Sequence, residues 1–147
     1  FGNLYIMNKQ TLETRRAMLF EKMGLTHDAK RRAEKYSGGM KRRLSVVLSL
    51  INDPRIAFLD EPTVAMDPQS RHAVWDFIKE LKTQKKTIIL TTHYMEEDEE
   101  LCDRVGIIDH GKLIALGSPN ELISYNSVKN LEEVFIKLTG RRIREEV

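Results

Sequence analysis

The sequence predicts an α/β fold: a mostly parallel sheet preceded by a helical subdomain. No strand pattern occurs before residue 55, whereas short runs rich in β-branched and aromatic residues alternate with helical patterns after it. Two of these runs end in polar residues, at 60–61 and at 92–93. Because ligands bind at the carboxyl ends of strands in open α/β sheets, these endings indicate a functional edge.

Length and composition agree with a soluble domain that buries a core of its own. The chain has 147 residues, a net charge of +2 and one cysteine, Cys102, which forms no internal disulfide and suits a reducing compartment. No apolar run approaches the length of a membrane span. Because the sequence starts with neither an initiator methionine nor a signal peptide, we expect a piece of a longer protein.

Two helices are expected in the first third of the chain. Residues 11–23 place Leu12, Leu19, Phe20 and Met23 on one side, and Gly24 is a suitable helix stop. The basic run 28–35 is read as a second helix. Residues 1–43 carry 11 Lys and Arg against 4 Asp and Glu, which leaves a nucleic-acid function open, although such a charge run is more often a solvated helical face.

The segment Tyr36-Ser37-Gly38-Gly39-Met40 precedes an apolar helical run that ends at Ile51. Ser37 is a good helix cap, and the two glycines allow a ligand to approach the backbone closely. The N–H groups at the start of such a helix attract anions. By itself the loop is a weak signal, because most Ser-Gly-Gly segments are ordinary turns.

The strand expected at 55–60 ends in Asp60 and Glu61, and Pro62 ends its ladder. Two adjacent carboxylates repel each other unless a cation or a reacting proton compensates them. Mg²⁺ binds few protein carboxylates and completes its shell with water and phosphate oxygens. Asp60 is therefore a candidate metal ligand and Glu61 a candidate base; a solvated acidic turn is the alternative.

A helix and a second strand follow. Asp67 and Pro68 supply a cap and a first-turn proline, and the helical spacing of Val74, Phe77, Ile78 and Leu81 predicts a face packed on the sheet together with Trp75. The strand at 87–91 ends at Thr92-His93. A lone histidine is usually structural, but its position on the same edge as Asp60 makes His93 a candidate.

The remaining segments predict local structure. Residues 95–102 form a short helix whose acidic side chains are expected mainly in solvent. Residues 104–109 and 112–116 form a hairpin across His110-Gly111, although 106–113 imitates the phosphate-binding pattern G-x-x-x-x-G-K-[ST]; Leu113 has no hydroxyl for a metal, and the context is wrong. A capping box opens at Ser118, and a last helix begins at Asn130, with Leu131, Val134, Phe135 and Leu138 on one face.

In combination, these motifs resemble the nucleotide-binding subunit of ABC transporters, from about residue 4 to 140. The signature loop is 36–40, the Walker B strand is 56–60 followed by Glu61, the D-loop is 65–67, and the switch histidine is His93. The segments 94–104 and 131–135 are similar to the drug-export, or ABC-2, branch. The resemblance implies a P-loop NTPase-like ABC ATPase core.

The resemblance also implies roles in ATP hydrolysis with ATP and Mg²⁺. Asp60 would hold Mg²⁺ through water, Glu61 would be the general base, and His93 would contact the γ-phosphate. The signature residues Ser37, Gly38 and Gly39 would bind ATP held by the opposite subunit, and Asp67 would couple the two sites. These roles suit a reaction that requires charge compensation, an oriented water and aligned N–H donors.

The resemblance is incomplete. Ala65 replaces the usual D-loop glycine, and Met66 stands where leucine is common. There is no Walker A loop, adenine-stacking strand or Q-loop glutamine in the printed sequence. We therefore expect a C-terminal part of the ATPase that is inactive alone, with a helical signature subdomain at 1–51, the second half of the RecA-like core at 52–127, and a C-terminal helix and tail at 128–147.

In the whole protein the resemblance implies a paired ATPase subunit, or a homodimer, bound to a separate membrane-spanning permease. It would lie in the cytoplasm at the inner face of the cell membrane and power export of a small molecule or drug, with no nucleic acid bound. The alternatives are an ABC-type ATPase of DNA repair or chromosome organisation, which would insert long coiled coils, and a non-catalytic dimerisation module.

The family's Walker A strand lies between the strands at 87–91 and 104–109. Since unpaired strand edges recruit other strands, its absence predicts one of two outcomes for this chain. Either these two strands pair directly, or a second copy fills the gap by strand exchange.

Overall fold

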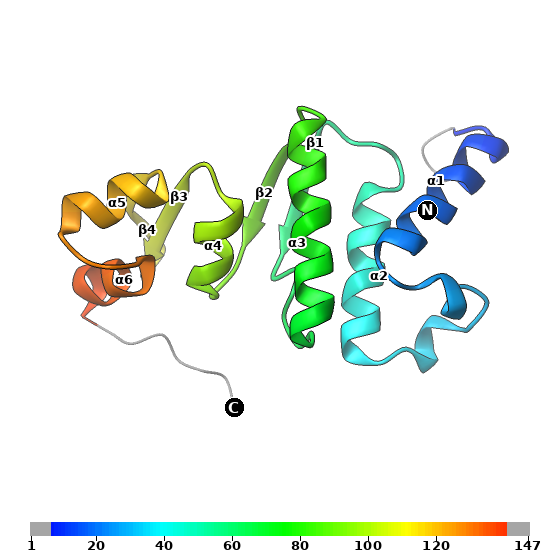
Figure 1. The fold of residues 1–147 in the computed structure, drawn as a ribbon, viewed down its shortest axis with the longest axis horizontal. Coiled ribbons are helices and arrows are strands. Elements are labelled where there is room, and N and C mark those ends of the chain that lie inside the picture. The colour runs from blue at the N-terminus through cyan, green and yellow to red at the C-terminus, as the bar shows by residue number, and fades with distance from the viewer. Residues whose placement is uncertain (1–6, 141–147) are drawn as a thin grey trace. The chain divides into compact units, whose positions relative to one another are not determined.

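Residues 7–140 are described by a computed structural model (Figure 1). The chain divides into two compact units, Phe1–Thr91 and Thr92–Val147, and each is described by itself. The expected C-terminal tail, 141–147, lies outside the described residues. Within the described part, no helix has both the length and the apolar character needed to cross a membrane.

The first unit begins with helices, as expected. α1 (Lys9–Lys22) buries Leu19, and Gly24 follows it in the left-handed conformation, with φ 60°. The predicted basic helix at 28–35 is wrong. That stretch holds only two single 3₁₀ turns, Thr26–Asp28 and Ala33–Lys35, neither with a buried residue. A run of charges without an apolar stripe has no face to pack, and short helices need such packing.

The signature segment and the carboxylate strand form as the sequence predicts. Ser37 caps α2 (Gly38–Leu50) by accepting a hydrogen bond from the Met40 amide at 3.3 Å. β1 (Ile56–Asp60) follows after a turn. No strand precedes β1 in the described residues, which agrees with a helical start to the chain.

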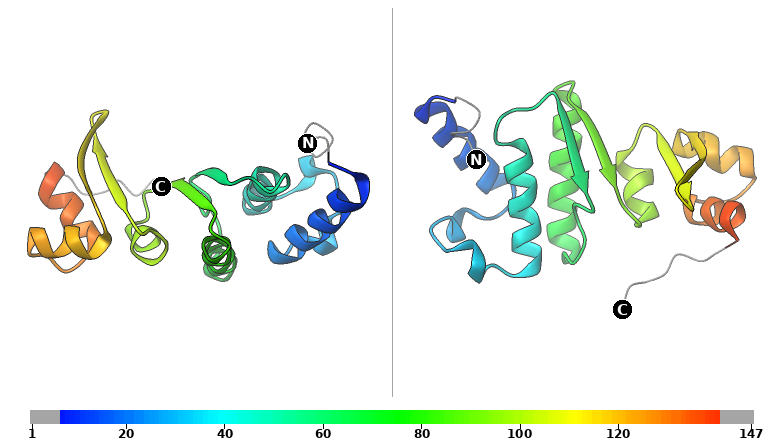
Figure 2. Two further views of the ribbon diagram at one scale, coloured as in Figure 1. Left: turned by 90° about the horizontal axis from the view of Figure 1, so that it is seen from above. Right: turned by 180° about the vertical axis from the view of Figure 1, so that it is seen from behind.

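A strand–helix–strand unit completes the first unit. Asp67 caps α3 (Pro68–Thr83), which buries Val74, Trp75, Phe77, Ile78 and Leu81 as predicted. β2 (Thr87–Thr91) then pairs with β1 in parallel, with Asp60 opposite Thr91. Figure 2 shows β1 and β2 side by side, with α3 on one face of the pair; α2 also packs against β1.

The two faces of this small sheet differ. Ala57 and Leu59 point toward the helices and are buried, whereas the alternate residues of β1 are exposed. Phe58 is 72% exposed, and Ile56 and Ile89 are about half exposed. The helix-free face of the sheet is therefore an apolar surface that carries Asp60 and Thr91 at its carboxyl edge.

The second unit is built around a hairpin. β3 (Val105–Asp109) pairs antiparallel with β4 (Lys112–Gly117). Its turn residues, His110 and Gly111, have φ of 46° and 73°, as a two-residue hairpin turn requires. The hairpin confirms that the G-x-x-x-x-G-K pattern here is not a phosphate-binding loop.

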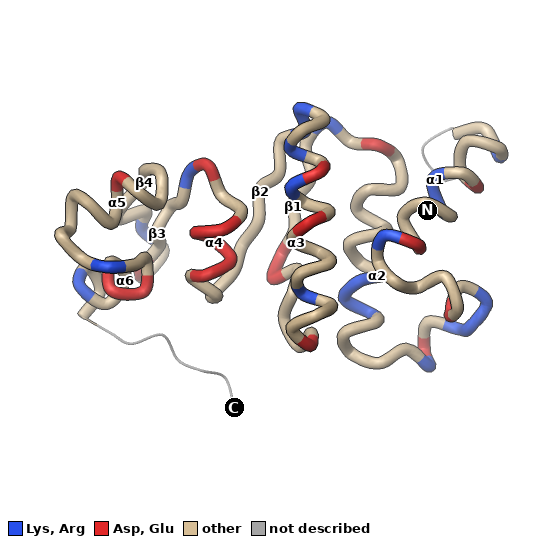
Figure 3. The backbone as a smooth tube through the Cα atoms, viewed as in Figure 1, with Lys and Arg blue, Asp and Glu red and all other residues tan. Residues whose placement is uncertain are grey.

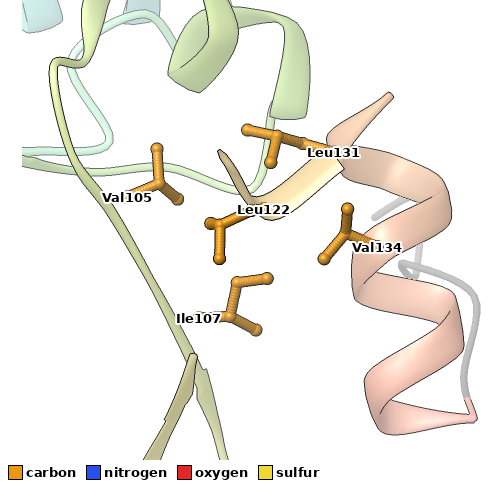
Figure 4. Packing of buried hydrophobic residues seen from close by; sticks show 5 residues of the cluster. All are labelled: Val105, Ile107, Leu122, Leu131 and Val134. Atoms are coloured by element: carbon orange, nitrogen blue, oxygen red, sulfur yellow. The ribbon is translucent and has the colours of Figure 1, made fainter. Parts of the chain in front are cut away.

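Three helices pack with the hairpin: α4 (Met95–Leu101), α5 (Pro119–Asn126) and α6 (Leu131–Thr139). Figure 4 shows the core of the unit, to which β3 contributes Val105 and Ile107, α5 Leu122, and α6 Leu131 and Val134; Met95 of α4 packs against it. The capping box at Ser118 and Glu121 is formed, and Asn130 caps α6. The predicted face of α6 is correct except at its end, where Leu138 is 40% exposed.

The acidic residues of α4 lie mainly in solvent, as expected, with one exception. Figure 3 shows acidic residues along this helix, but Glu97 is fully buried rather than solvated. Residues 95–101 span nearly two turns, so an acidic run of this length places at least one member on the inner face. Because most residues of this segment are acidic, the sequence pattern did not indicate that one face of the helix is buried.

The observed strand pairing tests the first of the two outcomes expected in the absence of the Walker A strand. The described residues form two separate two-stranded sheets, β1–β2 and β3–β4. Direct pairing of 87–91 with 104–109 is therefore wrong. β2 pairs instead with β1, to which α3 connects it, and β3 pairs with β4 across the two-residue turn at His110-Gly111. Strand exchange with a second copy stays a prediction.

Candidate functional site

The carboxyl edge of the β1–β2 sheet brings a carboxylate and a hydroxyl together. The Thr91 hydroxyl donates to Asp60 Oδ1 at 2.5 Å, from the position directly opposite in the parallel ladder. Hydrogen bonds to a carboxylate are shorter and stronger than neutral ones. Asp60 is exposed on the face that carries no helix.

Glu61 follows Asp60 with an unusual backbone. Its φ is 49°, in the left-handed region, where a non-glycine residue costs about 1–2 kcal/mol. Its amide donates to the carbonyl oxygen of Thr91 at 3.0 Å and lies 3.3 Å from the Thr91 hydroxyl. Thr91 therefore holds both consecutive carboxylate residues, one through its side chain and the other mainly through its backbone.

Arg42, on α2, holds the other side of Glu61. Its Nε donates to the carbonyl oxygen of Glu61 at 2.5 Å, and the Val64 amide donates to the same oxygen at 3.3 Å. The sequence did not single out Arg42, which sits within the basic run 41–43 and shows no pattern of its own. Only the packing of α2 on β1 reveals its partner.

The signature loop presents backbone at the start of α2. A Cβ added to Gly38 would meet nothing within 4 Å, so the loop is open there. A Cβ on Gly39 would lie 3.2 Å from the carbonyl oxygen of Ala65, which brings the signature and D-loop backbones together. Ala65 itself has φ 58°, a conformation in which glycine carries no steric penalty.

Asp67 lies just beyond that contact and caps α3. Its Oδ1 accepts from the Ser70 amide at 2.9 Å. Hydrogen bonds from the Ser70 side chain and then its backbone lower the pKa of Asp67, with a smaller contribution from the charge of Arg43. Asp67 is therefore a charged, exposed helix cap next to the signature loop.

His93 belongs to the second unit, which begins at Thr92. It follows β2 in the turn before α4, and its ring lies 4.3 Å from that of Tyr94, centroid to centroid. Within the first unit, the structure thus joins Asp60 and Glu61 through Thr91 and, in a separate set of contacts, brings Gly39 against the D-loop backbone at Ala65. His93 is described only in its own unit.

The donor set fits Mg²⁺ and phosphate in kind. Among the described residues, no group of three or more His, Cys, Asp or Glu side chains could hold a metal alone. An exposed single carboxylate such as Asp60 suits Mg²⁺ that is shared with phosphate oxygens and water. The open N-terminus of α2 suits an anion, because its first N–H groups have no helical partner.

Comparison with known proteins agrees with this geometry. A family model described as "ABC transporter" matches residues 3–64, a span that includes the signature loop, Asp60 and Glu61. The chain belongs to the ABC transporter family. A solved structure titled "Structure of ATP binding subunit of ABC transporter" superposes with a TM-score of 0.82 at 26% identity, covering 92% of this chain and 57% of that one.

Curated relatives that match most of the chain are named as ATP-binding proteins of drug resistance or export. The doxorubicin resistance ATP-binding protein DrrA of Mycobacterium tuberculosis is 46% identical over 122 residues, 83% of this chain and 37% of the relative. The linearmycin resistance ATP-binding protein LnrL of Bacillus subtilis is 44% identical over 84% of the chain and 40% of the relative.

A third relative, the Nod factor export ATP-binding protein I of Ralstonia nicotianae, is 44% identical over 92% of this chain and 42% of the relative. The chain thus spans about two fifths of the length of these three relatives.

Proposed function

We propose that this chain is the part of an ABC exporter's ATP-binding subunit that activates the attacking water and offers a signature loop to a second ATP site. The observation that carries the proposal is the sheet edge at which Asp60, Thr91 and Glu61 are joined by hydrogen bonds. The relatives support an exporter rather than a nucleic-acid ATPase or a dimerisation module.

In this proposal Glu61 is the general base of ATP hydrolysis. Its carboxylate takes a proton from water as the water oxygen attacks the γ-phosphorus, and ADP leaves with the electrons of the broken P–O bond. Asp60 is the residue that would hold Mg²⁺ through water; that ion supplies compensation for phosphate charge. His93 contacts the γ-phosphate, a role that rests on the resemblance alone.

Ser37, Gly38 and Gly39 act on ATP held by the opposite subunit, which is a second copy or a paired ATPase. The exposed backbone at Gly38 supports this role, because an anion can reach the first N–H groups of α2. Asp67, beside the loop, couples the two sites. Since closure then requires ATP in both subunits, hydrolysis can drive a separate membrane-spanning permease at the inner face of the cell membrane.

The domains proposed above remain 1–51, 52–127 and 128–147, with the rest of the ATPase core contributed by sequence outside this chain. The exposed apolar face of β1–β2 supports this. Phe58, Ile56 and Ile89 would bury a substantial apolar area if covered, and each side chain of this size gains about 1.5–3 kcal/mol on full burial.

Exchanging Glu61 for glutamine in the full-length protein tests the proposal. Glu61→Gln should lower kcat by about 10²–10⁴-fold, the usual loss of a general base, and leave ATP binding unchanged. Glu132→Gln, an exposed change on α6, is the matched control. Hydrolysis by Glu61→Gln at the parental rate would show that Glu61 only ends a strand.

The 147-residue chain alone should show no tight ATP binding and no turnover. It lacks the lysine and N–H cradle that hold the β- and γ-phosphates in P-loop enzymes. Glu61-dependent hydrolysis by the purified chain would contradict the division of labour proposed here.

A separate variant tests whether the signature loop acts on ATP that the opposite subunit binds. Gly39→Asp in the full-length protein should lower turnover while each monomer still binds ATP, since a carboxylate would face the partner's phosphate. A large loss of ATP affinity in the monomer would instead place the loop at its own subunit's site.

A further inference from the structure

We propose that Arg42 is a positioning residue that fixes the Glu61 backbone and ties it to the helix of the signature loop. The inference rests on the proposed role of Glu61 as general base. It adds a residue that touches neither water nor phosphate and acts through the peptide that carries the base.

The geometry starts on α2. Ser37 caps this helix, and Arg42 lies little more than one turn further along. Its side chain, half-buried, crosses to the end of β1, where Nε donates to the Glu61 carbonyl oxygen at 2.5 Å. Arg42 and Asp60 also line a common hollow of about 170 Å³ between α2 and β1.

Glu61 requires such support because of its conformation. With φ at 49°, its backbone occupies a region that non-glycine residues hold only where the surroundings enforce it. β2 enforces it at the amide, through Thr91, and α2 enforces it at the carbonyl, through Arg42. Rotation of this peptide would swing the carboxylate away from any fixed water.

The contact also joins two sites. The same helix presents Gly38 and Gly39 at its N-terminus and Arg42 one turn later. In the proposed dimer, the loop meets one ATP while Glu61 serves the other. A shift of α2 on engaging the partner's phosphate therefore acts on the Glu61 peptide through one rigid guanidinium, whose planar donors hold a fixed direction better than a flexible ammonium.

The test is Arg42→Met in the full-length protein. It should lower kcat about 10- to 100-fold, the loss expected from a misplaced catalytic group, with the KM for ATP changed less than about two-fold because Arg42 does not contact the nucleotide. Arg42→Lys restores a donor and should recover part of the rate. Arg32→Met, a matched change at an exposed arginine, should keep the parental kcat.

A second measurement separates positioning from a general loss of structure. In single-turnover hydrolysis, Arg42→Met added to Glu61→Gln should cause no further loss, because the two residues act as one unit. If the two losses multiply, or if Arg42→Met keeps the parental rate, the positioning role is overturned. If Arg42→Met fails to fold, Arg42→Lys takes its place in the same cycle.

Failure of the inference about Arg42 can be distinguished from failure of the proposed function. A parental rate for Glu61→Gln removes the base and with it the proposed function. A parental rate for Arg42→Met beside an inactive Glu61→Gln removes only the inference about Arg42.

Discussion

The two units of this chain are held together in different ways. In the second unit, most connections are local: a two-residue turn joins β3 to β4, and a capping box opens α5 directly after β4. One bond there spans a long stretch of sequence, from the Leu131 amide to Glu99 Oε1. In the first unit the important bonds join residues far apart in sequence, such as Arg42 with Glu61 and Thr91 with Asp60. Arg15 likewise donates to the carbonyl oxygens of Leu50 and Ile51 at the end of α2.

This difference matches the proposed division of work. The second unit buries a small apolar cluster and holds its shape through packing. The first unit holds consecutive carboxylate residues at a sheet edge through hydrogen bonds from two other elements. A catalytic constellation needs direction more than burial, and long-range hydrogen bonds supply direction.

The largest effect should come from the core of the second unit. Leu131 is 0% exposed, so Leu131→Ala should destabilise that unit by about 2–5 kcal/mol. Hydrogen–deuterium exchange in the full-length protein should then rise in residues 105–140 and change little in α2 and α3. Leu138→Ala, on the same helix but exposed, is the control and should cost far less. Equal losses of protection in both units would contradict their separate cores.

Removing the Thr91 hydroxyl should lower the ATPase rate that we propose for the first unit. Thr91→Val keeps the shape but removes the donor to Asp60, and a hydrogen bond to a charged group contributes about 1.5–3 kcal/mol. We expect about a 10-fold loss of ATPase rate in the full-length protein and a need for more Mg²⁺. Thr87→Val, on the same strand and also exposed, should be silent. Parental activity in both variants would leave the Asp60–Thr91 bond without a catalytic role.

A smaller effect of the opposite sign is expected at Ala65. Because its φ is 58°, Ala65→Gly relieves strain and should stabilise the protein by up to about 1 kcal/mol, measured as a rise in Tm. Ala17→Gly in the interior of α1 has no strain to relieve and should destabilise by about 1 kcal/mol. A loss of stability in both variants would mean that the D-loop backbone is not strained.

The smallest expected effect is on side-chain pKa values. It compares a serine–carboxylate hydrogen bond at a helix N-terminus in each unit. Hydrogen bonds from Ser70 lower the pKa of Asp67, and hydrogen bonds from Ser118, its backbone first, lower the pKa of Glu121. A depressed folded-state pKa contributes stability above the unfolded-state pKa, and that stability is lost as pH falls through the folded value. NMR titration should show both pKa values below their ordinary range. Ser70→Ala should raise that of Asp67 and leave that of Glu121 unchanged.

The sequence alone determined the features that depend on neighbouring residues. Ser37, Asp67 and Ser118 cap helices as predicted, because a cap needs only a side chain and an amide two or three residues away. The strands at 56–60 and 87–91 and the hairpin turn at His110-Gly111 also follow from local composition.

Only the tertiary structure decided which distant residues meet. It buried Glu97 inside an acidic run, paired β2 with β1 rather than with β3, and gave Arg42 the Glu61 carbonyl as its partner. None of these has a sequence period, because each depends on which face of one element packs on another. The exposed or buried state of a charge, and the direction of a long side chain, are settled by that packing and by the energy of leaving a polar group unpaired.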